Sequence, residues 1–371
     1  MKNKAINHLN VNTVDSLKNS KTKLPSYLAI GGMVLGSTFA GINSADAGNV
    51  GNGITDDDNT ATAYVFNIAA KDLTITSDNT TSPDVTTVQT AAITDTAGAN
   101  GNTGDLIITS QATDDNAGFI VTVASVIMDN EGTVGANAIT DVDDSIGNMT
   151  VTFTGAYLHT GGLTMTTLEN TDSETLTVNF DGATTFTLIS DLVVSDNITG
   201  SINAKFSAAA IFIAGLDLKD SASDGTSTIT FDSVAGTQAI GGVINGQAND
   251  MGTIAVTNTA GKVSFAAAIG GINDIKNITI GTTADDSSAN FAAAVNANTI
   301  TVQGGEAAVE DSLAEFDAAV TGAIVLNPGT LGDATADFMD VNAIIALTST
   351  ITTTNTTGDK TSVRVYDAGG G

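Results

Sequence analysis

The sequence lacks cysteine and tryptophan altogether, and it contains only three prolines, two histidines and one arginine, Arg364. Without cysteine, disulfide bonds, thiolate catalysis and zinc–sulfur sites are excluded. With one arginine, the bidentate clamps that hold phosphate or carboxylate groups are largely unavailable. Beyond residue 47 the only histidine is His159, in a Tyr-Leu-His-Thr-Gly segment. We expect its side chain to be exposed in a turn and to have no catalytic role.

Basic residues are scarce throughout the chain. Twelve Lys and Arg stand against 41 Asp and Glu, which gives a formal net charge of −29. Residues 48–371 keep 7 of these bases and 39 of these acids, a net charge of −32. Such a surface repels nucleic acid and anionic lipid, so we expect neither as a partner. It attracts divalent cations, and a hydrophobic content of 42% indicates a folded chain.

What the sequence does contain is a row of phenylalanines at nearly constant spacing. They are Phe153, Phe180, Phe206, Phe231, Phe265, Phe291 and Phe316, separated by 27, 26, 25, 34, 26 and 25 residues. A fixed period in this range is typical of repeat architectures. We interpret the long step as a 25-residue unit with nine residues inserted near 239–247. We interpret Phe186 and Phe212 as a second aromatic repeating at the same interval.

Short runs in which apolar and small polar residues alternate lie between the phenylalanines, as at 176–180 and 299–302. This alternation, rich in Val, Ile and Thr, predicts β-strands, and the intervening Gly, Asn, Asp and Ser predict turns. A unit of about 26 residues holds three strands of five or six residues with their turns. The sequence therefore predicts an all-β fold, a parallel β-solenoid with coils of about 26 residues.

Residues 1–47 have the pattern of an export signal peptide. Five lysines precede an apolar stretch at 27–42, and Ala45-Asp46-Ala47 offers a cleavage site before Gly48. We therefore expect an exported protein that is extracellular or lies on the outer surface of a Gram-negative bacterium.

The remaining chain divides into two predicted regions. Residues 48–150 are expected to form an N-terminal β region or a cap for the solenoid, and residues 151–371 the repeat region. Near 306–320, Val309, Leu313, Phe316 and Val320 follow helical spacing, with acidic residues on the other side. This spacing predicts a short helix inserted at one level of the solenoid.

Carboxylates are the only abundant reactive groups. Adjacent pairs occur at Asp114-Asp115, Asp143-Asp144 and Asp285-Asp286, the residue type that polysaccharide-cleaving solenoids use. Adjacent residues in a turn point apart, so we expect no enzyme.

Calcium binding fits the acidic turns better. Two clusters provide several hard oxygen ligands within one loop, Asp56, Asp57 and Asp58, and Asp141, Asp143 and Asp144. Solvated turn aspartates are the alternative, because neither cluster follows the EF-hand pattern.

Phrases within residues 225–303 carry a family resemblance: Thr-Ile-Thr-Phe231, Ile269-Gly-Gly-Ile272 and Asn298-Thr-Ile-Thr-Val302. They resemble the passenger repeats of rickettsial-type surface-layer autotransporters. The resemblance implies a secreted parallel β-solenoid with a non-enzymatic surface role. Such proteins end in a β-barrel, and no closing run of alternating strands with aromatic girdles is present here. We therefore expect either a passenger fragment or a surface protein exported by another route.

Together these features predict a self-assembling structural protein of the cell surface, with calcium bridging its copies. One alternative is an adhesin that binds a host receptor or cell-surface polysaccharide through loops at 95–105 and 232–252. A less favoured alternative is a polysaccharide-degrading enzyme.

Overall fold

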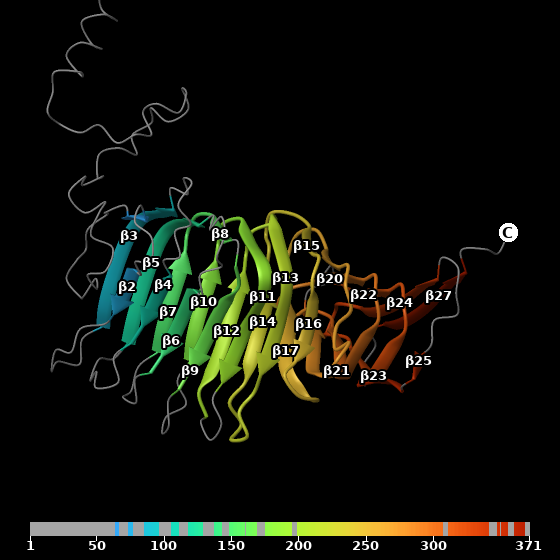
Figure 1. Cartoon of the computed structure of the whole chain (residues 1–371). Coiled ribbons are helices and arrows are strands. Elements are labelled where there is room, and N and C mark those ends of the chain that lie inside the picture. The colour runs from blue at the N-terminus through green and yellow to red at the C-terminus, as the bar shows by residue number, and fades with distance from the viewer. Residues whose placement is uncertain are drawn as a thin grey trace, which may run out of the picture.

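The computed structural model describes residues 64–66, 73–76, 85–95, 105–110, 118–128, 137–142, 148–159, 161–168, 175–194, 199–306, 311–340, 347–348, 350–354 and 360–367. Their strands stack in parallel into a rod, a β-solenoid (Figure 1). The predicted fold class is confirmed. No helix among the described residues is long and apolar enough to span a membrane. The predicted signal peptide lies outside these residues.

Each coil passes through three strand positions, which we call faces A, B and C. Face A consists of β7 (Asn148–Phe153), β10 (Thr175–Phe180), β12 (Ser201–Phe206), β14 (Ser227–Phe231), β17 (Met251–Val256), β19 (Ile275–Ile280) and β26 (Ile351–Thr353). Face B consists of β1 (Tyr64–Phe66), β8 (Tyr157–His159), β15 (Gln238–Ile240), β18 (Val263–Phe265), β20 (Ser288–Phe291), β22 (Ser312–Phe316), β24 (Ala334–Asp340) and β27 (Thr361–Asp367). Face C consists of β2 (Leu73–Thr76), β4 (Leu106–Thr109), β6 (Asn137–Asp141), β9 (Leu163–Thr167), β16 (Val243–Gly246) and β25 (Leu347–Thr348).

Six longer strands turn a corner of the coil and serve two faces. They are β3 (Val85–Asp95) and β5 (Gly118–Met128) from A to B, β11 (Thr184–Val194) and β13 (Ile211–Lys219) from B to C, and β21 (Val295–Gln303) and β23 (Val320–Asn327) from C to A. Strands on both sides of residue 150 pair in parallel, β5 with β7. The division into two regions at that residue stays a prediction.

The coils shorten along the rod. On face A, paired residues are 33 positions apart at Val85 and Gly118 but only 22 apart at Asn277 and Thr299. The predicted coil of about 26 residues lies between these limits. The cross-section that the side chains must fill is therefore larger near the N-terminal end.

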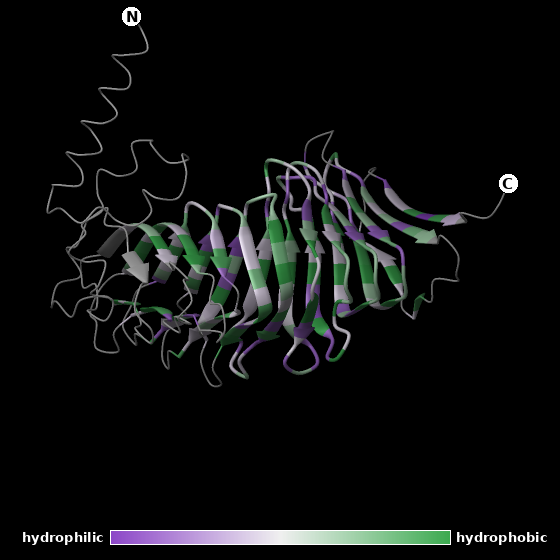
Figure 2. Cartoon of the chain, turned by 45° about the horizontal axis from the view of Figure 1, so that its top comes forward, coloured by the Kyte–Doolittle hydropathy of each residue, from purple (hydrophilic) through white to green (hydrophobic). Residues whose placement is uncertain are grey.

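Alternation of the side chains builds the core. On β10, Leu176, Val178 and Phe180 are buried inside the coil, while the residues between them face outward. The same period-two pattern repeats on most described strands, and Figure 2 shows it as hydrophobic bands crossing the ribbon. The apolar core is continuous along the rod.

The phenylalanine row is in fact two columns on different faces. Phe153, Phe180, Phe206 and Phe231 stack in register on face A, with ring centroids 4.9 to 5.7 Å apart. Phe265, Phe291, Phe316 and Phe338 stack in register on face B, at 5.1 to 5.4 Å.

The long step between Phe231 and Phe265 is the change of face. Phe231 pairs with Val256, 25 residues later, and Phe265 follows nine residues further on, on the next strand. The predicted nine-residue insertion near 239–247 is therefore wrong, because those residues form β15 and β16 of an ordinary coil.

The second predicted aromatic repeat is also wrong. Phe186 pairs with Ile213, and Phe212 pairs with Thr185. Phe186 is buried, whereas the side chain of Phe212 is 54% exposed. A shift of one residue moves a side chain to the opposite side of a strand.

The predicted helix near 306–320 is wrong as well, since residues 312–316 form strand β22. Ser312, Ala314 and Phe316 point inward, and Leu313 points outward. The inward residues before Phe316 are too small or polar to show the alternation, so the outward Leu313 produced an apparent helical pattern. Residues 307–310 lie outside the described residues.

Candidate functional site

The predicted calcium ligands are mostly not described: Asp56, Asp57, Asp58, Asp143 and Asp144 fall outside the described residues. Asp141 ends β6 and is buried, and its Oδ1 accepts a hydrogen bond from Ser110 Oγ at 2.7 Å. Within the described ranges, no three His, Asp or Glu side chains gather closely enough to hold a metal. The calcium site stays a prediction.

His159 is buried on face B, not exposed in a turn as expected. Its register neighbours are Met128 in the coil before and Phe186 in the coil after. Burial lowers the pKa of His159 to about 4, and a contact with the Gly162 backbone opposes this only partly. Because a substrate cannot reach a ring inside the coil, a role as catalytic base is excluded for this geometry.

A second buried polar group lies next to this histidine in the chain. Asn137 donates from Nδ2 to the Tyr157 hydroxyl at 2.9 Å and accepts from the Leu106 backbone N–H at 2.9 Å. Burial raises the pKa of Tyr157, so its hydroxyl stays protonated. These bonds join successive coils from inside, and their role is structural.

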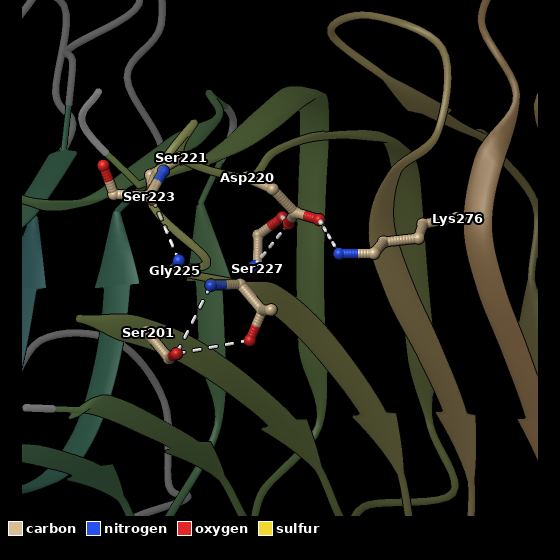
Figure 3. A network of polar contacts seen from close by, with 8 residues as sticks. Ser201, Asp220, Ser221, Ser223, Gly225, Ser227 and Lys276 are labelled. Atoms are coloured by element: carbon tan, nitrogen blue, oxygen red, sulfur yellow. Dashed lines mark hydrogen bonds and ion pairs between the residues drawn. The ribbon is translucent and has the colours of Figure 1, made fainter. Parts of the chain in front are cut away.

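Asp220 organises the largest polar network that is drawn in Figure 3. Its Oδ1 accepts hydrogen bonds from the backbone N–H of Ser227 at 2.7 Å and from the hydroxyl of Ser227 at 2.8 Å. Lys276 Nζ lies 3.8 Å from its Oδ2. Ser221 Oγ accepts from the backbone N–H of Gly225 at 2.9 Å and closes the same turn. The network fastens the corner between β13 and β14, and the fully buried Ser227 hydroxyl is closed to substrates.

The carboxylate pairs proposed for polysaccharide cleavage are not assembled into a site by the described residues. Asp285 and Asp286 lie in a turn in which Thr282 Oγ1 accepts from the Asp285 backbone N–H at 2.9 Å. The other two pairs fall outside the described residues.

One acidic pair that the sequence did not suggest lies on face C. Asp191 and Asp217 are in register on β11 and β13, one coil apart. Burial, together with the charge of Asp217, raises the pKa of Asp191. Like charges held side by side favour a bound cation or proton.

The predicted adhesin loops are only partly loops. Residues 238–246 within 232–252 form strands β15 and β16, so the connecting segments are just 232–237 and 247–250. Most of 95–105 lies outside the described residues.

The strongest candidate for a functional surface is the last coil, formed by β25, β26 and β27. In register with the buried Ala336 and Phe338 of β24, β27 places Val363 and Val365 at inward positions. These valines are nevertheless 46% and 77% exposed, against 5% for Phe338. Among the described strands, only β24 pairs with β27, so its other edge is open.

The sequence contained a signal for this surface, the alternation in 361–366, but not the fact that no described coil covers it. Comparison of the chain with protein-family models, with curated proteins and with solved structures finds no match. The function is therefore inferred from the geometry of the rod and its open end.

Proposed function

We propose that this protein is a non-enzymatic structural protein of the cell surface that assembles end to end into a filament or layer. The observation that carries the proposal is the open last coil. Val363 and Val365 occupy core positions of the solenoid yet remain exposed. Burying such residues is favourable by about 1.5–3 kcal/mol each, which is the driving force for covering them.

The two ends of the described rod are complementary. At one end β1 pairs only with β3, and at the other β27 pairs only with β24. Both belong to face B, so a second copy continues the same parallel ladder by placing its first coil on the last coil of the first copy. An open strand edge is a template for such pairing. A head-to-tail contact of this kind does not close on itself, and it produces filaments.

The acidic surface suggests how filaments associate sideways. At a net charge of −29, neighbouring rods repel each other unless cations lie between them. The Asp191–Asp217 pair on face C provides one place where a calcium ion would relieve repulsion. We therefore expect calcium to bridge rods laterally.

A location on the outer surface of a Gram-negative bacterium is part of the proposal. It is based on the signal-like residues 1–47 and on the resemblance of 225–303 to surface-layer autotransporter repeats. An adhesin or passenger fragment is the second candidate, favoured by a polar groove on face B with room for a ligand.

Electron microscopy of the full chain at increasing concentration, in calcium and then in EDTA, tests the proposal. We expect filaments that associate sideways in calcium and separate in EDTA. Val365→Asp places a charge in the end contact and should leave single short rods. Thr352→Asp, which adds the same charge to the same coil at an outward position, should still form filaments. Single rods from the unchanged chain under all conditions would refute end-to-end assembly.

A further inference from the structure

A groove runs along the outside of face B near the C-terminal end of the described rod. It encloses about 450 Å³, within the usual range of ligand-binding pockets. It is lined by Ser288, Asp311, Ser312, Leu313, Asp333, Thr335, Lys360, Thr361, Ser362 and Arg364. Four of these, Ser288, Leu313, Thr335 and Ser362, form one register column across β20, β22, β24 and β27. The groove is therefore parallel to the rod axis and spans four successive coils.

The lining of the groove differs in charge from the rest of the protein. It combines two acids, two bases and five hydroxyl groups, so its formal charge is zero in a chain of net charge −29. Arg364, the only arginine of the sequence, is one of the two bases. Side chains of this kind provide hydrogen-bond donors and acceptors along a shared path, with Leu313 as the apolar contact.

The two carboxylates are held in place by the coils that follow them. Asp311 Oδ1 accepts from the backbone N–H of Asp333 at 2.8 Å, and Asp333 Oδ1 accepts from the backbone N–H of Lys360 at 3.1 Å. Each carboxylate therefore retains a second oxygen as an acceptor. Because successive coils are about 4.8 Å apart, these acceptors repeat at that interval along the groove.

The two bases supply donors beside these acceptors. Arg364 donates from Nε and Nη2 to the buried Asp337 at 2.6 and 2.7 Å, which fixes the guanidinium and raises the pKa of Arg364. Its other N–H groups are not used in these bonds. Lys360 forms no ion pair with the described residues, so its ammonium group also remains a donor.

We propose that this groove binds an extended oligosaccharide along the rod axis. Sugar hydroxyls both donate and accept, which matches the fixed carboxylate oxygens and the neighbouring cations and hydroxyls. One coil is close in length to one sugar residue of an extended chain, so each residue meets a similar set of groups. Nucleic acid is disfavoured because Asp311 and Asp333 repel phosphates. A lipid chain is disfavoured because Leu313 is the only aliphatic side chain in the lining.

This inference is independent of end-to-end assembly, since the groove uses outward positions of β27 and the end contact uses inward ones. Isothermal titration of the full chain with cellohexaose, chitohexaose and hexagalacturonate tests it. We expect at least one of these to bind, and Asp333→Asn to weaken it at least tenfold. The amide introduced by this substitution keeps an Oδ1 that accepts from the Lys360 N–H, so the coil is preserved. Ser362→Leu, which fills the groove, should weaken binding by a similar factor.

Two control variants separate binding in the groove from effects elsewhere on the rod. Asp274→Asn removes the same charge outside the groove and should bind like the unchanged chain. Val365→Asp should lose end-to-end assembly but keep oligosaccharide binding. No binding of any of the three sugars at millimolar concentration would overturn the proposal. So would binding that is unchanged in both groove variants, or a heat of calcium binding lost in Asp333→Asn while the sugars stay silent.

Discussion

The two phenylalanine columns fill the same solenoid in different ways. In the first half the rings lie on face A and also contact rings of face B: Phe206 stacks on Phe180 and Phe231 and meets Phe186 edge-on at 6.3 Å. In the second half the rings lie on face B, and face A carries only aliphatic side chains, such as Ile280 and Val302. The interior therefore changes from two aromatic faces to one.

This difference follows the length of the coils. Paired residues are 27 apart at Thr150 and Thr177 but 22 apart at Asn277 and Thr299. A longer coil encloses a wider interior, which needs two rings or buried polar groups such as Asn137 and His159. A shorter coil is filled by one ring and aliphatic side chains. Native packing density thus selects one large ring per short coil, on whichever face supplies it.

The largest expected effect comes from removing one ring of each column. Phe206→Ala and Phe291→Ala should each lower the free energy of unfolding by about 3–5 kcal/mol, because a cavity replaces a buried ring. Phe206 contacts three rings and Phe291 two, so Phe206→Ala should cost more. Urea denaturation measures both, with Thr301→Ala on the outward side as the control. Equal losses below about 1 kcal/mol would show that the columns do not carry the core.

A pH effect should be confined to the wider half. Burial depresses the pKa of His159 to about 4 from 6.5, so the unfolded chain binds a proton more readily than the folded one. Its contribution is fully present above pH 6.5 and is lost as the pH falls from 6.5 through 4, by about 3 kcal/mol in total.

The measurement is the stability difference between the unchanged chain and His159→Leu as a function of pH. Subtracting the variant removes the titration of the many carboxylates. We expect the difference to favour the unchanged chain least at pH 4. A difference that stays constant between pH 4 and 6.5 would mean that the ring is solvated.

Much of the fold was predictable because the period and the alternation are both written in the apolar residues. The face of each ring was not, since Phe231 and Phe265 look like one series when only the spacing is seen. The strand at 312–316 was missed because Ser312 and Ala314 fill inward positions in a narrow coil. The groove and the open last coil were beyond prediction, because both depend on which coils lie side by side and which end is left uncovered.

The smallest expected effect is at the crossing between the two columns. Phe231 and Phe265 meet edge-to-face, with centroids 5.5 Å apart and planes at 79°, on successive strand positions of different faces. In a double-mutant cycle, Phe231→Leu and Phe265→Leu should show a coupling of about 0.5–1.5 kcal/mol. Phe153→Leu and Phe316→Leu, which belong to different columns and share no ring contact, should be additive within about 0.5 kcal/mol. Additivity at the crossing would mean that the two columns are separate cores, and a coupling would mean that the aromatic contact is continuous where the face changes.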